Sequence, residues 1–235
     1  MKNIFITGVS TGLGNALAHA YLENGDRVYA VGRNLPKMFE HYTNFVFFPY
    51  DLHETFTLKN TLKEFISKRS FDIAILNAGI LGEITPLSTT NLETIKEVME
   101  INVWANKEII DALNECAFVK QVIAISSGAS INGSKGWGAY ALSKAALNML
   151  LNVYAKELPD IHFTALAPGV VDTGMVRHII NEINEDEFPS VTRLKNNPIQ
   201  SPKDAAQRLI KAFPSLLEHE SGSFIDIRTI ALITP

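Results

Sequence analysis

Apolar runs of strand length alternate with longer helical patterns, and this alternation sets the strongest limit on the fold. Most runs are continuously apolar, as in strands buried on both faces of a parallel sheet. The runs are NIFIT, RVYAVG, FVFFPY, DIAILN, QVIAIS, HFTALAP and SFIDIR. The helical patterns span Leu13 to Asn24, Glu54 to Lys68, Leu92 to Glu115, Trp137 to Glu157 and Pro202 to Ala212. Repeated βαβ units predict an α/β fold, a doubly wound parallel sheet of about seven strands with helices on both faces.

The domain organisation follows from uniform composition. The 235 residues show no composition break, low-complexity tract or internal repeat. We therefore predict a single domain over residues 1–235. The charged, irregular segment 173–201 is expected to cross the strand ends as a substrate lid.

Charge and composition exclude several classes of function. A net charge of −4 without a Lys/Arg block argues against a nucleic-acid partner. No run approaches the length of a membrane helix, and the N-terminus runs directly into a glycine turn rather than resembling a signal peptide. The single cysteine, Cys116, fits a reducing cytoplasm, and the histidine spacing does not resemble a metal site.

A glycine-rich turn follows the first apolar run as Gly8-Val-Ser-Thr-Gly12-Leu-Gly14. Glycines allow a tight turn and let the backbone approach a pyrophosphate, whose charge the next helix N-terminus would meet. Ser10 and Thr11 would add hydroxyl donors. The spacing differs from the commoner G-x-G-x-x-G fingerprint, and a merely structural turn is the alternative. With a strand before it and a helix after it, the turn predicts a dinucleotide site.

The end of the second run bears on the choice of cofactor. Proteins that bind NAD place an acidic residue about 20 residues after the glycines, on the ribose 2′-hydroxyl. Here that position holds Gly32, followed by Arg33. A guanidinium binds phosphate well, so the sequence favours NADP(H) over NAD(H). The alternative is that Arg33 is an ordinary surface residue.

Tyr140 and Lys144 lie in a run rich in helix formers, so their spacing places both side chains on one helix face. A phenol ordinarily has a pKa near ~10. An ammonium about 4 Å away, at an effective dielectric of about 20, would favour the phenolate by about 4 kcal/mol. That lowers the phenol pKa by roughly three, toward the range of a general acid–base group. Ser127 ends the run VIAIS, where a hydroxyl would hold a substrate carbonyl oxygen.

These features together resemble the short-chain dehydrogenase/reductase family. The matching motifs are Thr7-Gly8-x-x-x-Gly12-x-Gly14, Asn77-Ala78-Gly79, Asn102, Ser127, Tyr140-x-x-x-Lys144 and Pro168-Gly169. They appear in family order over nearly the whole chain. The family usually doubles the asparagine before Ala-Gly, whereas this chain has Leu76-Asn77, which leaves the role of Asn77 intact. The resemblance implies a Rossmann fold.

The resemblance also implies catalytic roles for four residues. Tyr140 would be the general acid/base. Lys144 would bind the nicotinamide ribose and lower the tyrosine pKa. Ser127 would orient the substrate carbonyl, and Asn102 would position Lys144 and a water for proton relay.

Cofactor contacts are implied in the same way. Asp51, of the pair Asp51-Leu52, would contact the adenine, and Asn77 would support the ribose and brace the sheet. The Pro168-Gly169 turn and Thr173 would hold the nicotinamide. The expected cofactor-binding residues are Gly8, Ser10, Thr11, Gly12, Leu13, Gly14, Arg33, Asp51, Leu52, Asn77, Ala78, Gly79, Tyr140, Lys144, Pro168, Gly169, Val171 and Thr173.

The function expected from these residues is NADPH-dependent reduction of a ketone or aldehyde, with a small carbonyl or alcohol compound as substrate. Within the family, the chain most resembles single-domain reductases, including the sepiapterin and benzil reductase types. One alternative is an NAD-dependent alcohol or hydroxysteroid dehydrogenase, which Arg33 argues against. Another is a non-catalytic NADPH-binding sensor, which would not need the catalytic residues. Trp137, Phe188 and Met175 are candidates for either the substrate pocket or the core.

The resemblance further implies an oligomer. Family members commonly pair the helices corresponding to 92–115 and 137–157 across a two-fold axis, which predicts a homodimer, with a homotetramer as the alternative. The apolar tail containing Ile230, Leu232 and Ile233 is a second candidate contact. Its alternative is packing against its own sheet.

Overall fold

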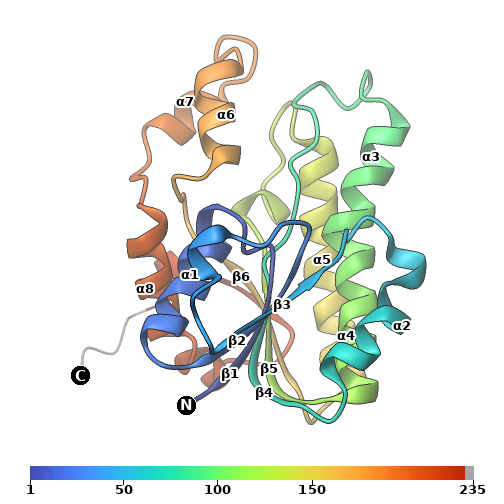
Figure 1. Ribbon diagram of the computed structural model, residues 1–235. Coiled ribbons are helices and arrows are strands. Elements are labelled where there is room, and N and C mark those ends of the chain that lie inside the picture. Colours follow the sequence, from blue (N-terminus) through green and yellow to red (C-terminus); the bar gives the residue numbers. More distant parts are fainter. Residues whose placement is uncertain (231–235) are drawn as a thin grey trace.

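A computed structural model describes residues 1–230 of the chain as a parallel sheet with helices on both faces (Figure 1). The seven strands lie in the order β3-β2-β1-β4-β5-β6-β7, and every neighbouring pair is parallel. They are β1 (Asn3–Thr7), β2 (Arg27–Gly32), β3 (Phe45–Pro49), β4 (Ser70–Leu76), β5 (Phe118–Ile125), β6 (His162–Ala167) and β7 (Ser223–Asp226). The doubly wound sheet predicted from the apolar runs is confirmed.

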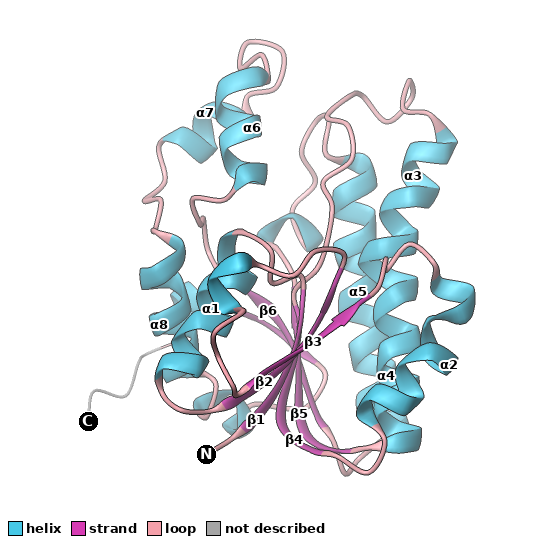
Figure 2. Cartoon of the chain, in the orientation of Figure 1, coloured by secondary structure: helices cyan, strands magenta, loops and turns pink. Residues whose placement is uncertain are grey.

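Two layers of helices cover the sheet (Figure 2). On one face, α1 (Gly12–Glu23) and α8 (Pro202–Ala212) enclose one apolar cluster. On the other, α2 (Thr55–Ile66), α4 (Ala105–Cys116) and α5 (Gly138–Glu157) enclose a second. The helices α3 (Leu92–Met99), α6 (Gly174–Glu182) and α7 (Ser190–Lys195) extend past the carboxyl ends of the strands.

Burial explains the continuous apolar runs. Strands β1, β4, β5 and β6 lie inside the sheet and are largely buried, because helices cover both of their faces. The edge strand β3 is only partly buried along its length, although its run is equally apolar. Its aromatic side chains instead stack on one another and on α2, as Phe48 does on Phe65.

The sheet reverses its winding direction beside β1. That strand has β2 on one side and β4 on the other, because the chain continues outward to β2 and β3 before it returns to β4. The loops after β1 and β4 therefore diverge, and a crevice forms between them at the carboxyl ends of the strands.

The predicted helix over 92–115 is interrupted. A π-helical turn from Glu100 to Trp104 separates α3 from α4 and contains the predicted catalytic residue Asn102. Such wide turns often mark functional positions in helices. Here the turn aims Asn102 at the loop after β4, where its amide hydrogen-bonds both backbone groups of Ile80.

The end of the described chain bears on the predicted tail contact. Ile230 is partly buried and packs against the apolar cluster between the sheet and helices α1 and α8. At this residue the tail therefore packs against its own sheet, which was the alternative to an intersubunit contact. Leu232 and Ile233 lie outside the described residues. Within residues 1–230, no helix is long and apolar enough to cross a membrane.

The core is expected to depend on Phe71 of β4, which is fully buried with its ring 5.7 Å from Phe5 and 5.3 Å from Tyr29. Phe71→Ala should lower the free energy of unfolding by about 3–5 kcal/mol, because it leaves a cavity. Phe118, at the start of the neighbouring β5, is 77% exposed. Phe118→Ala should change the free energy of unfolding by less than about 0.5 kcal/mol. Urea denaturation measures both, and equal losses would contradict this packing.

Candidate active site

A cleft of about 840 Å³ opens along the crevice at the carboxyl ends of the strands. The predicted residues in its wall are Gly8, Ser10, Thr11, Gly12, Leu13, Arg33, Asp51, Leu52, Asn77, Ala78, Gly79, Ser127, Tyr140, Lys144, Pro168, Gly169, Val171 and Thr173. Gly14 and Asn102 are the two predicted residues outside the wall, and both are buried behind it.

The glycine turn after β1 is shaped for a close backbone approach. Gly8 and Gly12 have φ of +73° and +62°, a region that other residues rarely adopt. A side chain at Gly14 would overlap the carbonyl oxygen of Gly8 and the amide of Asn77. Gly14 therefore supports the turn from behind, while Gly8 and Gly12 face the cleft.

Asn77 ties this turn to the loop after β4. Its Nδ2 donates to the carbonyl oxygens of Thr7 and Gly8, at 3.1 and 3.0 Å. In return, Thr7 Oγ1 accepts hydrogen bonds from the amides of Asn77 and Ala78, at 3.0 and 3.1 Å. These contacts hold both sides of the crevice in one rigid arrangement.

The wall near α1 suits an anionic ligand. Thr11 precedes α1 without capping it through its side chain, and the first turn contains no acidic residue. The positive end of the helix dipole is therefore available at the cleft. Arg33 and Asn34, after β2, line the same region. The glycine cradle, the helix N-terminus and the guanidinium together fit a phosphorylated dinucleotide.

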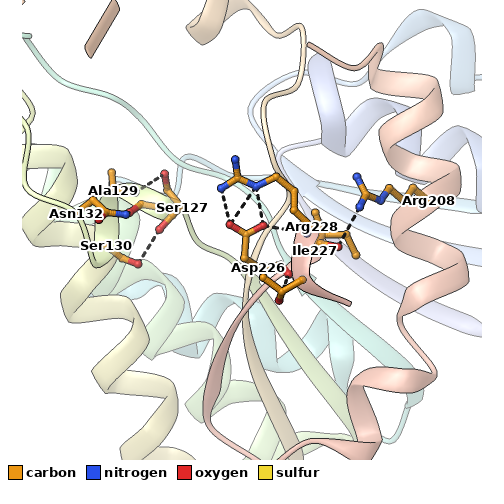
Figure 3. A network of polar contacts seen from close by, with 10 residues as sticks. Ser127, Ala129, Ser130, Asn132, Arg208, Asp226, Ile227 and Arg228 are labelled. Carbon is orange, nitrogen blue, oxygen red and sulfur yellow. Dashed lines mark hydrogen bonds and ion pairs between the residues drawn. The ribbon is translucent and has the colours of Figure 1, made fainter. Parts of the chain in front are cut away.

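Ser127 follows β5 and is fixed by the short turn behind it (Figure 3). Its Oγ accepts a hydrogen bond from the amide of Ala129 at 3.1 Å. The Ser130 hydroxyl donates to the Ser127 carbonyl oxygen at 2.7 Å and accepts from Asn148 Nδ2 at 2.8 Å. This network anchors the turn to α5 and holds Ser127 beside Tyr140.

Tyr140 and Lys144 both reach the cleft from α5, as their spacing predicts. Lys144 is 4% exposed. Its Nζ lies 5.7 Å from the centroid of the Tyr140 ring and donates to the Ile125 carbonyl oxygen at 2.8 Å. The ammonium is thus held between the end of β5 and the phenol.

Burial controls the protonation of this pair, and the expected lowering of the tyrosine pKa is wrong for this structure. Burial raises the pKa of Tyr140 to about 12, against an opposing hydrogen bond with Ser127. Burial also lowers the pKa of Lys144 to about 8. Desolvation penalises both charged forms, and the ammonium at this distance does not offset the penalty on the phenolate. The phenol is therefore protonated at neutral pH, ready to donate a proton.

Asn102 positions its neighbours from behind the wall. Its Nδ2 donates to Ser143 Oγ on α5 at 2.9 Å, and its Oδ1 accepts from the Ile80 amide at 2.8 Å. A side chain at Gly79 would meet both Asn102 Oδ1 at 3.0 Å and Lys144 Nζ at 3.5 Å. Asn102 therefore links the loop after β4 to α5.

The segment 173–201 forms α6 and α7, which project beyond the strand ends (Figure 1). Ile179, Phe188 and Val191 from this segment form a third apolar cluster with Leu81 and Ile84. Phe188, a candidate for either pocket or core, is thus a core residue of this cluster.

Two hydrogen bonds join α7 to the loop before α5. Trp137 Nε1 donates to Ser190 Oγ at 2.7 Å, and Arg193 Nη2 donates to Ser134 Oγ at 2.9 Å. Trp137 and Met175, the other two candidates for the pocket, do line the cleft. The segment thus closes one side of the cleft.

Several cleft residues escaped the sequence analysis because they stand in loops or short helical segments without a recognisable pattern. Those with polar side chains include Asn132, Ser134, Arg193, Asn197 and Arg228. Arg228 had one usable signal, since it ends the apolar run SFIDIR. A charged residue there lies at the same sheet edge as Ser127.

The glycine cradle at the winding reversal and the Ser-Tyr-Lys group in the same cleft define a dehydrogenase that uses a dinucleotide. The short chain dehydrogenase family matches residues 2–184. The chain therefore belongs to the short-chain dehydrogenase family.

Individual relatives agree with this assignment. A benzil reductase ((S)-benzoin forming) from Bacillus cereus is 34% identical, with 94% of this chain and 95% of that protein covered. An NADPH-dependent pterin aldehyde reductase from Arabidopsis thaliana is 27% identical, with 74% and 77% covered. The crystal structure of a short-chain dehydrogenase/reductase from Saccharomyces cerevisiae has a TM-score of 0.83 at 25% identity, covering 99% and 98%.

The buried Lys144 should make stability depend on pH. Its pKa is lowered to about 8 in the folded protein, so between about pH 8 and the ordinary lysine pKa near ~10.4 the unfolded chain binds more protons. Below this pH window the buried Lys144 charge destabilises the folded protein to its full extent. The destabilisation decreases as pH rises through the window, because Lys144 loses its proton in the folded protein first. Relative to Lys144→Met, the free energy of unfolding of the wild type should increase by about 2 kcal/mol from about pH 7 to about pH 9.5.

Urea denaturation of both proteins across this range measures the difference, in which the titration of groups common to both proteins cancels. A difference that stays constant over the range would contradict a depressed pKa at Lys144.

Proposed function

We propose that this protein is an NADPH-dependent reductase of ketones or aldehydes. The main support is that Ser127, Tyr140 and Lys144 share one cleft with the glycine cradle beginning at Gly8. Bound NADPH would supply a hydride to the carbonyl carbon, while a proton reaches the carbonyl oxygen, giving an alcohol and NADP⁺.

The side chains would divide the proton chemistry. The Tyr140 phenol, kept protonated by burial, would donate its proton to the substrate oxygen as negative charge develops there. Ser127 would hydrogen-bond the same oxygen. The Lys144 ammonium would stabilise the phenolate left behind, because it is buried beside the ring. Asn102 would keep the lysine and the helix in place through Ser143.

Arg33 supports NADP(H) as the cofactor. Its guanidinium lines the cleft after β2, next to the glycine turn that provides Ser10 and Thr11. A guanidinium matches a ribose 2′-phosphate by charge and by bidentate geometry. The name of the pterin aldehyde reductase relative, NADPH-dependent, points the same way.

Residues 1–235 would work as one domain. Within it, the segment 173–201 would act as a lid over the substrate end of the cleft. Its α7 is joined to the loop before α5 through hydrogen bonds between the side chains of Trp137 and Ser190 and of Arg193 and Ser134, and through the apolar cluster described above. Separating these contacts would open the cleft without disturbing the sheet.

The protein would also form a homodimer through α4 and α5. Leu142, Met149 and Val153 lie along α5 at helical spacing and are 50%, 62% and 44% exposed. Trp104, before α4, is 46% exposed. Such an apolar stripe on a helix is typical of an interface.

Tyr140→Phe should lower kcat by about 10²–10⁴-fold while NADPH still binds, because it removes the donated proton and little volume. Tyr154→Phe is the matched control, since its hydroxyl lies on the same helix but donates to Asp111 at 2.5 Å, outside the cleft. NADPH consumption with diketones, quinones and aromatic aldehydes measures turnover. Full activity in Tyr140→Phe would contradict the assigned role. Wild type that binds NADPH and reduces nothing would favour the sensor alternative.

Arg33→Met should weaken NADPH binding by about ten- to hundredfold, the range for losing a charged hydrogen-bond donor, with little effect on NADH. Arg27→Met is the control, because Arg27 is exposed at the opposite end of the same strand. Calorimetric titration with both nucleotides measures the affinities. Tighter binding of NADH than of NADPH by the wild type would favour the NAD-dependent alternative.

A further inference from the structure

The short helical turn after β7 brings an arginine to the catalytic end of the cleft. Ile227–Thr229 forms this turn, and Ile227 is fully buried beneath it. Arg228 therefore projects from a fixed base into the cleft wall, which it shares with Ser127. The mechanism described above does not use this side chain.

Arg228 lies beside two glycines of the cleft wall. A Cβ at Gly169 would lie 3.9 Å from Arg228 Cγ, and a Cβ at Gly128 would lie 4.0 Å from its Nη2. The stem thus passes the Pro168-Gly169 turn, and the guanidinium reaches the residue that follows Ser127. Figure 3 shows Arg228 extending toward Ser127.

Asp226 holds the guanidinium in this orientation. Arg228 Nε donates to Asp226 Oδ1 at 2.9 Å, and Nη2 donates to Oδ2 at 2.6 Å. The Asp226 side chain is 16% exposed, whereas that of Arg228 is 53% exposed. The hydrogen bond from Arg228 also holds the pKa of Asp226 below its usual range. The pair is therefore neutral overall, and among residues 1–230 Nη1 has no hydrogen-bond acceptor, so it can donate to a ligand.

We propose that Arg228 is a substrate-binding residue that selects vicinal dicarbonyl compounds, by donating a hydrogen bond to the second carbonyl oxygen while Ser127 and Tyr140 hold the first. The inference rests on the proposed reductase function. A neutral arginine–aspartate pair suits an uncharged carbonyl oxygen. The guanidinium lies beside Gly128 and shares the cleft wall with Ser127, so it can donate to a second oxygen of a substrate whose first carbonyl is held by Ser127.

Two ketones of similar size separate this role from general binding. Benzil has two adjacent carbonyl groups between two phenyl rings, and deoxybenzoin keeps the rings but replaces one carbonyl by a methylene. Arg228→Met should lower kcat/KM for benzil by about ten- to hundredfold, through a higher KM, and change that for deoxybenzoin by less than about threefold. Arg228→Lys retains a positively charged donor group, so its kcat/KM for benzil should lie between the values of the wild type and of Arg228→Met.

Arg208→Met is the matched control. Arg208 donates to the carbonyl oxygen of Ile227 at 3.1 Å from outside the cleft, so its loss disturbs the same turn without removing a cleft donor. Figure 3 shows Arg208 reaching this turn from the side opposite to Ser127. The selectivity for benzil over deoxybenzoin should be unchanged in Arg208→Met, and NADPH affinity should be unchanged in every variant.

Binding without turnover provides a second readout. Trp137 lines the cleft, so quenching of its fluorescence reports the dissociation constants of both ketones in the presence of NADP⁺. Weaker binding of benzil, but not of deoxybenzoin, by Arg228→Met and not by Arg208→Met would support the inference. If no protein reduced either ketone, the proposed reductase function would fail while this binding result would still stand. Equal losses on both ketones, no loss on either, or a loss of NADPH affinity would overturn the role of Arg228 while leaving the reductase function standing.

Discussion

Four hydrogen bonds between the ends of β1 and β4 are the constraint on which the rest of the site depends. They join Thr7 and Gly8 to Asn77 and Ala78 at the place where the sheet reverses its winding. A parallel sheet opens a crevice there, because adjacent loops leave in opposite directions. These bonds fix the glycine turn against the loop after β4. With them, the backbone itself becomes a rigid wall facing the ligand.

The side of the cleft that contains Tyr140 and Lys144 depends on burial. Lys144 is almost fully enclosed, with one hydrogen bond to the end of β5, so its charge is costly in the folded protein. Leu147 and Leu151 on the same helix are fully buried and hold α5 against the sheet. Packing of the helix thus holds the Tyr140 phenol near the buried Lys144 ammonium, although burial disfavours that charge.

Segments far apart in sequence meet at this cleft because all seven strands run parallel. Every strand then presents its carboxyl end at the same edge, so the residues following β1, β2, β3, β4, β5, β6 and β7 converge there. Ser127 after β5 and Arg228 after β7 therefore share one cleft wall, although β6 lies between their strands. The segment 173–201 adds a further layer, since hydrogen bonds of Trp137 and Arg193 connect α7 to the loop before α5. The two ends of the cleft are consequently built by different loops on one sheet.

The sequence by itself determined the strands, the main helices and the glycine turn, because continuous apolar runs and glycine spacing are local patterns. It also placed Tyr140 and Lys144 on one helix face. Only the tertiary structure decided that Gly14 and Asn102 support the site from behind, since burial depends on distant neighbours. The same holds for the raised pKa of Tyr140, because desolvation comes from the whole surrounding fold and not from the lysine one turn away.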